Sequence, residues 1–291
     1  MSFRTVVITK QSKISYKNRF LVVKQEDNEK YIHLSEIDTV IVDSISVSIS
    51  SYLLKELADN KINIIFCDEK HNPFGELVPY YSKHNTSKMI KEQIKWKQSE
   101  KDKLWAEIVK NKIMNQALLL KKIKSSKYKL VLSYVNEVVD GDKTNREGHA
   151  AKVYFNALFG LDFTRTEDNL INAALNYGYS IILSSFTREI VANGYITQLG
   201  LFHDNMFNQF NLASDLMEPF RPLVDKCVLG MKLEQFEHEE KMWLVDILNQ
   251  EVQIDGKIQY VSNAIKIYCK SVFDALNEDD SALVRFYKIE L

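Results

Sequence analysis

Three polar residues in the second half of the chain have the types and spacing of a metal-binding or ion-paired group. His203 is followed by Asp215 after twelve residues and by Glu218 after fifteen. Asp215 and Glu218 are three positions apart, so on a helix they would share one face. A carboxylate that points into a helical bundle needs a partner. That partner could be a divalent cation, or it could be Arg221, three residues past Glu218.

A further acid, Glu147, interrupts a stripe of small and apolar residues in the segment REGHAAKVYF. Ala150 and Tyr154 fall near the same helical face as Glu147, so the carboxylate is expected to face packed side chains. His149 is two residues away, roughly 200° around a helix, and is poorly placed to bind the same ion. Periodicity alone leaves open whether Glu147 is a metal ligand or a surface group.

Common catalytic motifs of other kinds are missing from the sequence. It contains no G-x-x-x-x-G-K-[ST], G-x-G-x-x-G, H-E-x-x-H or G-x-S-x-G pattern. Phosphate-loop, dinucleotide, zincin and hydrolase-elbow sites therefore have no support.

Three segments, in order along the chain, resemble signatures of the spacer-acquisition integrase family of CRISPR systems. The first is REGHAAKVYF with Glu147, and the second is LNYGYS at residues 175 to 180. The third is LGLFHDNMFNQFNLASDLMEPFRPLVD, which holds His203, Asp215 and Glu218. This combination and order are harder to obtain by chance than any one element, and the resemblance extends from end to end.

The resemblance implies a set of site residues. Glu147, His203 and Glu218 correspond to the metal ligands and catalytic residues of the family, and Asp215 corresponds to a supporting acid. One imidazole and two carboxylates suit Mg²⁺ or Mn²⁺, with Mn²⁺ slightly favoured by the mixed ligand set. The glutamate in DLMEPFRP indicates the branch associated with type II systems.

The resemblance also implies a reaction. The 3′-hydroxyl of a captured DNA end (the prespacer) would attack a phosphodiester at the CRISPR repeat, and the metal would stabilise the developing charge. Two alternatives stay open at this point. One is a hydrolytic metal-dependent nuclease of branched DNA, and the other is a noncatalytic DNA-binding scaffold whose polar residues form a buried network.

Several basic residues are candidate DNA contacts. Those near the proposed ligands are Arg146, Lys152 and Arg221. The stretch from residue 86 to 129 is rich in lysine and poor in acids, and it adds Lys121, Lys122 and Lys124. It could follow a DNA backbone without reading sequence, or it could be a solvated helical face.

The expected partners follow from the resemblance alone. They are prespacer and repeat DNA, a second copy of the chain joined through a β-rich domain, and a small second Cas protein that bridges two dimers. For the type II branch they include further adaptation factors and the RNA-guided effector.

The elements that must position these residues fall into two groups. Alternating or continuous apolar runs predict strands in the first eighty residues, and helical spacing from residue 48 to 58 predicts one helix among them. The strands are expected at residues 5 to 9, 19 to 25, 31 to 34, 38 to 42, 63 to 66 and 75 to 81.

After residue 85 the apolar period changes from two to 3.6. Helices are expected at residues 88 to 123, 126 to 139, 144 to 159, 168 to 193, 204 to 218, 236 to 249 and 258 to 276. Gly178 lies within one of them and predicts a close helix contact. The fold class is therefore α+β: a small β-rich dimerisation domain at residues 1 to 85, then a larger all-α catalytic domain at residues 86 to 291.

Composition agrees with a globular protein. The 291 residues are 45% hydrophobic and 26% charged, with a net charge of -1. Three well-separated cysteines predict free thiols in the cytoplasm, and no apolar run predicts a signal peptide or a membrane span. The final segment, SALVRFYKIEL, could dock as a strand or bind a partner.

Overall fold

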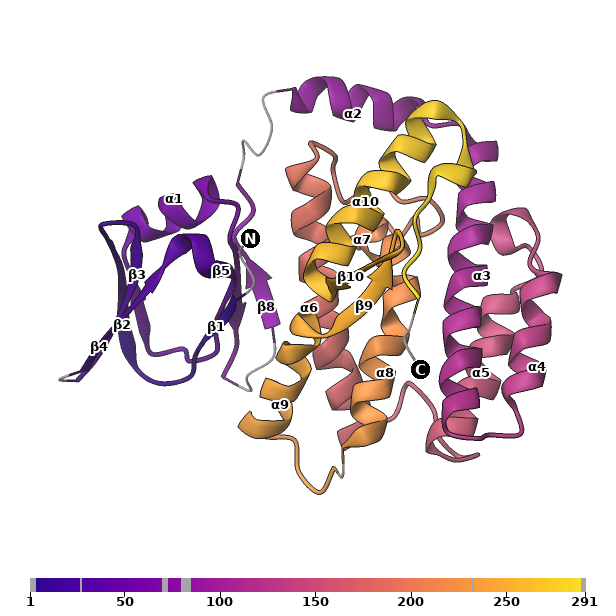
Figure 1. Cartoon of the computed structure of the whole chain (residues 1–291), viewed down its shortest axis with the longest axis horizontal. Coiled ribbons are helices and arrows are strands. Elements are labelled where there is room, and N and C mark those ends of the chain that lie inside the picture. The colour runs from indigo at the N-terminus through magenta and orange to yellow at the C-terminus, as the bar shows by residue number, and fades with distance from the viewer. Residues whose placement is uncertain (1–3, 27, 70–72, 80–84, 232, 289–291) are drawn as a thin grey trace. The chain divides into compact units, whose positions relative to one another are not determined.

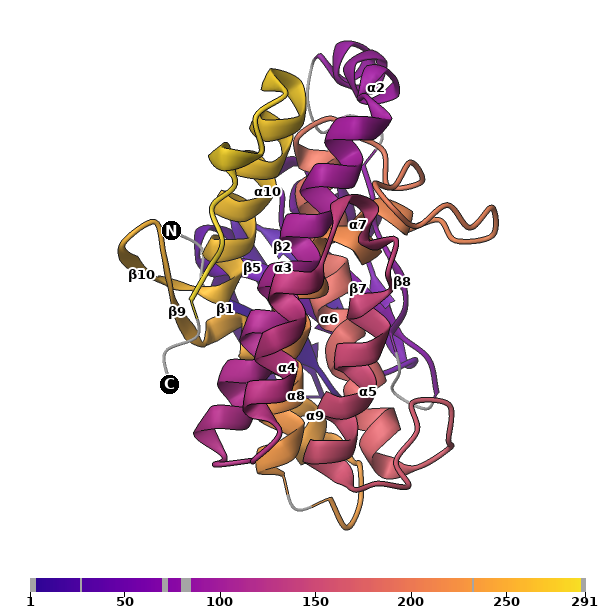
Figure 2. The same cartoon turned by 90° about the vertical axis from the view of Figure 1, so that its right-hand side faces the viewer.

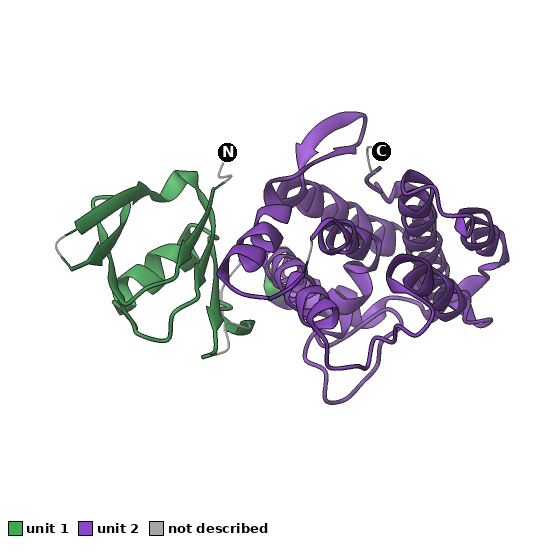
Figure 3. Cartoon of the chain, turned by 90° about the horizontal axis from the view of Figure 1, so that it is seen from below, with its two compact units in different colours: residues 1–86 green, residues 87–291 purple. Residues whose placement is uncertain are grey.

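A computed structural model of the chain describes residues 4–26, 28–69, 73–79, 85–231 and 233–288 (Figure 1). The chain divides into two compact units, Met1–Thr86 and Ser87–Leu291 (Figure 3). The first is rich in strands and the second in helices, which confirms the expected α+β class. The division falls one residue after the boundary expected at residue 85.

The described part of the first unit forms two four-stranded sheets, one α-helix and a short 3₁₀ turn at Leu34–Glu36. The strands are β1 (Arg4–Ile8), β2 (Ser12–Lys17), β3 (Phe20–Gln25), β4 (Asn28–His33), β5 (Ile37–Val42), β6 (Val47–Ile49), β7 (Asn63–Cys67) and β8 (Pro73–Glu76). One sheet has the order β1-β5-β7-β8, with β1, β5 and β7 parallel and β8 antiparallel to β7. The other has the order β4-β3-β2-β6, in which β6 runs parallel to β2.

One apolar core lies within this unit. It includes Ile14 and Leu21 from one sheet and Val40 and Ile64 from the other, all of them buried. Helix α1 (Ser51–Asp59) begins at Ser50, whose hydroxyl accepts a hydrogen bond from the third amide of the helix. Its apolar face joins the same core, as expected for an amphipathic helix.

Two expectations for the strands were wrong. No strand was expected between residues 9 and 19, but residues 12–17 form β2, and the turn to β3 is confined to Asn18 and Arg19. Both turn residues have a positive φ, 50° and 68°, as a type I′ hairpin turn requires. The last strand lies at Pro73–Glu76 rather than at 75 to 81, and residues 80 and 81 lie outside the described part.

The second unit is helical apart from one hairpin. Its helices are α2 (Thr86–Lys95), α3 (Gln98–Lys122), α4 (Tyr128–Ser133), α5 (Arg146–Phe159), α6 (Leu170–Ala192), α7 (Asn211–Leu216), α8 (Arg221–Gly230), α9 (His238–Val245) and α10 (Val261–Glu278). Short 3₁₀ turns occur at Tyr134–Glu137, Asp140–Asp142, Glu218–Phe220, Asp246–Asn249 and Ser281–Leu283. The long helix α3 lies beside α4 and α5 (Figure 2).

Helix α6 is the centre of this unit and packs against α7, α8, α9 and α10. Side chains of α8 and α9 pack directly against α6 at Gly178. A Cβ added to Gly178 would lie 2.5 Å from Cγ1 of Val224 and 3.3 Å from Cδ2 of Leu244. The close helix contact predicted for this glycine is therefore present.

The helix boundaries differ from expectation where the chain turns. The helix expected at 88 to 123 is broken between Lys95 and Gln98, and the one at 126 to 139 ends as 3₁₀ turns. Of the helix expected at 204 to 218, only α7 is regular. Helix α8 was not predicted, although Pro222 near its start is favourable there.

The expectation of an all-α second domain was wrong at one place. Strands β9 (Glu251–Ile254) and β10 (Lys257–Tyr260) form an antiparallel hairpin. Its turn residues, Asp255 and Gly256, both have positive φ. The Asp-Gly pair between alternating apolar residues is a hairpin signal, but no element was expected between the helices at 236 to 249 and 258 to 276.

The C-terminal segment docks on this hairpin. Lys288 forms an antiparallel bridge with Gln253, and Tyr287 is buried. Of the two roles left open for the segment, the docked one is present. No helix in the described ranges is long and apolar enough to cross a bilayer.

We predict that Gly178→Ala lowers the free energy of unfolding by roughly 1–3 kcal/mol, because the added methyl overlaps Val224 in a packed interface. Urea unfolding would measure the change. Gly230→Ala is the matched control, since a Cβ there meets open space, and it should change stability by less than about 0.5 kcal/mol. Equal effects of the two substitutions would contradict the close packing of α6 and α8.

Candidate active site

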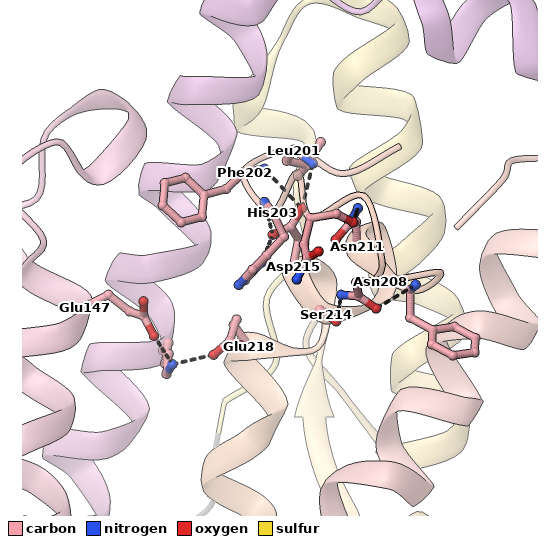
Figure 4. A network of polar contacts seen from close by, with 12 residues as sticks. Glu147, Leu201, Phe202, His203, Asn208, Asn211, Ser214, Asp215 and Glu218 are labelled. Atoms are coloured by element: carbon pink, nitrogen blue, oxygen red, sulfur yellow. Dashed lines mark hydrogen bonds and ion pairs between the residues drawn. The ribbon is translucent and has the colours of Figure 1, made fainter. Parts of the chain in front are cut away.

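Two acids predicted as site residues converge on one buried lysine. Glu147 lies in the first turn of α5 and Glu218 at the start of the 3₁₀ turn before α8. The Lys112 ammonium, from the middle of α3, donates to Glu147 at 2.5 Å and also to Glu218. Figure 4 shows the two glutamates on either side of this contact. The side chains of Lys112, Glu147 and Glu218 are 8%, 29% and 5% exposed.

The start of α5 is fixed by polar side chains that precede it. Asn145, with φ 50°, caps the helix and accepts a hydrogen bond from the amide of Gly148. The Asp142 carboxylate accepts from the amides of Arg146 and Glu147, at 2.9 and 3.0 Å. A negative group at a helix N-terminus is stabilising. These bonds hold the backbone of Glu147 in place.

Glu218 has cations at both oxygens. Arg221 donates from Nε to Oε1 at 2.7 Å, and Lys112 donates to Oε2. Burial alone would raise the pKa of Glu218, but Arg221 and Lys112 lower it to about 2. The ion pair with Arg221 that the spacing suggested is therefore present.

A buried tyrosine and aspartate network supports Arg221 from the other side. Its guanidinium lies 4.6 Å from the centre of the Tyr179 ring. The hydroxyls of Tyr179 and Tyr154 both donate to Asp225, Tyr154 at 2.8 Å. Burial raises the pKa of Asp225 to about 6, although both tyrosine hydrogen bonds act to lower it.

His203 is held by Asp215, which is fully buried. The Asp215 carboxylate accepts hydrogen bonds from the amides of Leu201, Phe202 and His203, at 2.6, 3.1 and 3.1 Å. It also lies 2.5 Å from Nδ1 of His203. The hydrogen bond to Asp215 raises the pKa of His203, although partial burial acts in the opposite direction.

The loop around Asp215 requires a glycine and an aromatic support. A Cβ at Gly200 would lie 2.3 Å from the His203 carbonyl oxygen and 2.7 Å from Oδ2 of Asp215. The Phe202 ring stacks on Trp105 of α3 with centroids 4.6 Å apart, and Trp105 meets the His203 ring edge to face. The His203 ring is thus oriented by both Asp215 and Trp105.

The backbone directly after Glu218 is also fixed. The carbonyl oxygen of Pro219 accepts a hydrogen bond from the Asn115 amide at 3.1 Å and from the Tyr287 hydroxyl at 2.7 Å. The Tyr287 ring packs on Phe220 with centroids 4.4 Å apart. Helix α3 and the C-terminal segment therefore both hold the turn that carries Glu218.

The predicted residues gather as two neighbouring groups. Glu147 and Glu218 meet through Lys112, and His203 pairs with Asp215 (Figure 4). The charges of Glu218 and Glu147 both raise the pKa of His203, so the two groups interact electrostatically. Across the residues that the structure describes, no three His, Cys, Asp or Glu side chains form a group that could hold a metal ion. The Lys112 ammonium lies between the two glutamates instead.

The donors nevertheless suit a divalent cation. Two carboxylates already converge on one positive charge. The Nδ1 atom of His203 is engaged by Asp215, so only Nε2 could bind a metal, and a carboxylate behind a ligating histidine is usual at metal sites. Oxygen and imidazole ligands fit Mn²⁺ or Mg²⁺.

The basic residues proposed to contact DNA lie in different settings. Arg146 pairs with Glu137 at 3.1 Å, and Arg221 is engaged by Glu218. The exposed lysines are Lys152 on α5, Lys121 and Lys122 at the end of α3, and Lys124 just after it. DNA contact by any of them remains a prediction.

Sequence reasoning missed Lys112, Asp142, Gly200 and Asp225. Lys112 was counted within the lysine-rich stretch proposed to follow DNA, but it is buried. It lies four residues after Ile108 and seven after Trp105, on the apolar face of α3. A lysine on an apolar helical face was a signal that its partner is an acid.

The sequence matches one protein-family model and is similar to curated proteins of the same family. The family model for "CRISPR associated protein Cas1" matches residues 5–246. The chain is 36% identical over 232 residues to the CRISPR-associated endonuclease Cas1 of Neisseria meningitidis serogroup C (strain 8013), covering 79% of this chain and 76% of that protein.

Two solved structures have a similar fold. A casposase bound to integration product aligns with a TM-score of 0.76 at 17% identity, covering 96% of this chain and 92% of that one. A chain of a Cas6-RT-Cas1–Cas2 complex aligns with a TM-score of 0.74 at 20% identity. That alignment covers 97% of this chain but only 36% of the chain in the complex.

We predict that Asp215→Asn lowers the free energy of unfolding by roughly 2–3 kcal/mol, because an amide cannot accept all the hydrogen bonds that reach this buried carboxylate. Hydrogen exchange should show faster exchange at the amides of residues 201–203. The control is Asp204→Asn, an exposed acid in the same loop. If the amides stay protected in Asp215→Asn, the carboxylate does not hold this loop.

We predict that Asp225 makes folding less favourable as pH rises. Its pKa of about 6 in the folded protein exceeds the ordinary 3.8, so the folded state binds the proton more tightly. Ionisation of the buried Asp225 lowers the free energy of unfolding. This loss is absent below the ordinary pKa and complete above about pH 6. Between pH 7 and pH 4.5 the wild type should gain roughly 2 kcal/mol relative to Asp225→Asn, measured by urea unfolding. Parallel pH profiles for the two proteins would show that Asp225 is not shifted.

Proposed function

The chain belongs to the Cas1 family of CRISPR-associated endonucleases and integrases, and on that premise we propose that it joins prespacer 3′-hydroxyl ends to a CRISPR repeat by metal-dependent transesterification. The observation that supports this most directly is that Glu147 and Glu218 converge on one positive charge, the Lys112 ammonium, near His203. Opposed carboxylates with a neighbouring imidazole form a suitable donor set for the metal that phosphoryl transfer requires.

The proposed metal is Mn²⁺ or Mg²⁺, held by carboxylate oxygens of Glu147 and Glu218 and by Nε2 of His203. When bound, it would polarise a phosphoryl oxygen and stabilise the charge that develops there. Asp215 keeps the proton of His203 on Nδ1, so that Nε2 offers its lone pair. Arg221 fixes one oxygen of Glu218 and limits the orientation of that carboxylate.

In the proposed reaction the prespacer 3′-hydroxyl releases its proton to solvent as its oxygen bonds to phosphorus at the repeat boundary. The bond from phosphorus to the 3′ oxygen of the repeat strand breaks, and that oxygen leaves as a new 3′-hydroxyl after taking up a proton. The number of phosphodiester bonds is unchanged, so no external energy source is required. With water as the nucleophile, the same residues would hydrolyse DNA instead.

The proposed DNA contacts are electrostatic. Lys152 and the lysines at the end of α3, Lys121, Lys122 and Lys124, are exposed and could bind phosphates without reading bases. Arg146 shares its guanidinium with the half-exposed Glu137, and it could exchange that partner for a phosphate.

The proposed assembly follows from the family. Cas2 is named with Cas1 in the complex that has a similar fold. We propose that this chain forms a homodimer through residues 1–85 and that a small second Cas protein bridges two dimers in the cytoplasm. Participation of type II adaptation factors and of the RNA-guided effector rests on the DLMEPFRP segment and on the Neisseria relative.

Two other functions each have one observation in their favour. The relatives are named endonucleases, which favours hydrolysis of branched DNA. Both oxygens of Glu218 are already engaged by Arg221 and Lys112, which favours a noncatalytic DNA-binding scaffold. Product analysis separates joining from hydrolysis, and metal binding separates an enzyme from a scaffold.

We predict that Glu147→Ala and His203→Ala each reduce strand joining at least about 100-fold while DNA binding is kept, because each removes a proposed metal ligand. The assay uses labelled 3′-hydroxyl DNA, a repeat-containing target, the small Cas partner and Mn²⁺. Glu251→Ala, at an exposed glutamate of β9, is the control and should join DNA as the wild type does.

Branched products from the wild type, lost in both site variants, would support the integrase mechanism. Cleaved but unjoined products would favour the hydrolytic nuclease. Joining at wild-type rates by Glu147→Ala and His203→Ala would rule out this metal site.

A further inference from the structure

Lys112 differs from the other lysines of residues 86–129. All the others in this described stretch are exposed or half-buried, whereas Lys112 is buried. It is also held from two directions, since both Glu147 and Glu218 accept hydrogen bonds from its ammonium. A charged group this deep in the protein must be compensated by opposite charge, and here the two glutamates supply it.

The ion-paired side chains Glu147, Glu218, Lys112 and Arg221 balance one another in charge without a metal. Glu147 and Glu218 carry two negative charges, and Lys112 and Arg221 carry two positive charges. A divalent cation bound by the same glutamates would add two positive charges to this buried group. The ammonium and the metal also compete for one position, because each requires the space between the two carboxylates.

The two positive side chains differ in their freedom to move. Arg221 stacks on Tyr179 and is anchored by its bond to Glu218. Lys112 carries a compact ammonium on a flexible four-carbon chain, which can swing to a new partner without a change in the helix. The nearest anion expected at a metal-bound site in this protein is a phosphodiester oxygen of DNA.

We propose that Lys112 is a phosphodiester-binding residue that is stored between Glu147 and Glu218 until a divalent cation takes its place. This inference rests on the proposed function, since it assumes that the two glutamates bind the metal. Metal alone would leave the displaced ammonium buried without a partner, and DNA alone would face two uncompensated carboxylates. Metal and DNA therefore each favour the binding of the other.

The test measures Mn²⁺ binding by electron paramagnetic resonance, which follows the signal of free Mn²⁺, with and without a branched DNA duplex. In the wild type, DNA should tighten Mn²⁺ binding by at least about tenfold. In Lys112→Met, Mn²⁺ should bind at least about tenfold tighter than in the wild type without DNA, since its competitor is gone. Added DNA should then tighten it less than about threefold.

Lys110→Met is the matched control, because Lys110 lies on the same helix but pairs with Glu107 at the surface. Its Mn²⁺ affinity and its coupling to DNA should equal those of the wild type. Circular dichroism would verify that Lys112→Met is folded. If Lys112→Met does not fold, the test rests on the wild type. Mn²⁺ binding that DNA does not tighten in the wild type then overturns the proposal.

Weaker Mn²⁺ binding in Lys112→Met than in the wild type would also overturn it, because Lys112 would then only organise the two carboxylates. That outcome leaves the proposed function intact, since the wild type still binds metal. If wild-type protein binds no Mn²⁺ and Glu147→Ala joins DNA normally, the proposed function fails and this inference fails with it.

Discussion

The mutual repulsion of the Glu147 and Glu218 carboxylates, which contact the same buried ammonium, is the constraint on which the packing of this part of the helical unit depends. Glu147 and Glu218 come from segments far apart in the sequence, and neither can approach the other without a positive charge between them. Helix α3 supplies that charge through Lys112. Helix α3 packs against α5 and α8, and the Asp142 carboxylate accepts hydrogen bonds from the first amides of α5. Together these contacts bring the three groups into place.

The change of apolar period after residue 85 predicted the two classes of structure well, because buried strands and amphipathic helices have different repeats. The long helices α5 and α6 were predicted to within two residues at each end. The short elements were not predicted with this accuracy. The hairpin at Asp255 and Gly256 and the irregular loop before α7 are fixed by turn geometry and by bonds to Asp215, which an apolar repeat does not encode.

The four principal site residues were named from the sequence through family resemblance rather than through periodicity. The sequence did not predict which positive side chains neutralise the charges of the acids. The partners of Glu218 include Lys112, which is 106 residues away, and such pairing depends on the tertiary packing of α3. Asp225 was missed for a similar reason, because its partners Tyr154 and Tyr179 lie on two other helices.

The hydrogen bond from Tyr287 to the carbonyl oxygen of Pro219 has a consequence for the order of events during synthesis. The turn that carries Glu218 is complete only when a segment made some seventy residues later has docked against it. A nascent chain in which Tyr287 has not yet been added lacks the hydrogen bond to Pro219 and the contact with Phe220. The turn that carries Glu218 therefore reaches its final form only after the chain has been synthesised beyond Tyr287, although Glu218 itself is made much earlier.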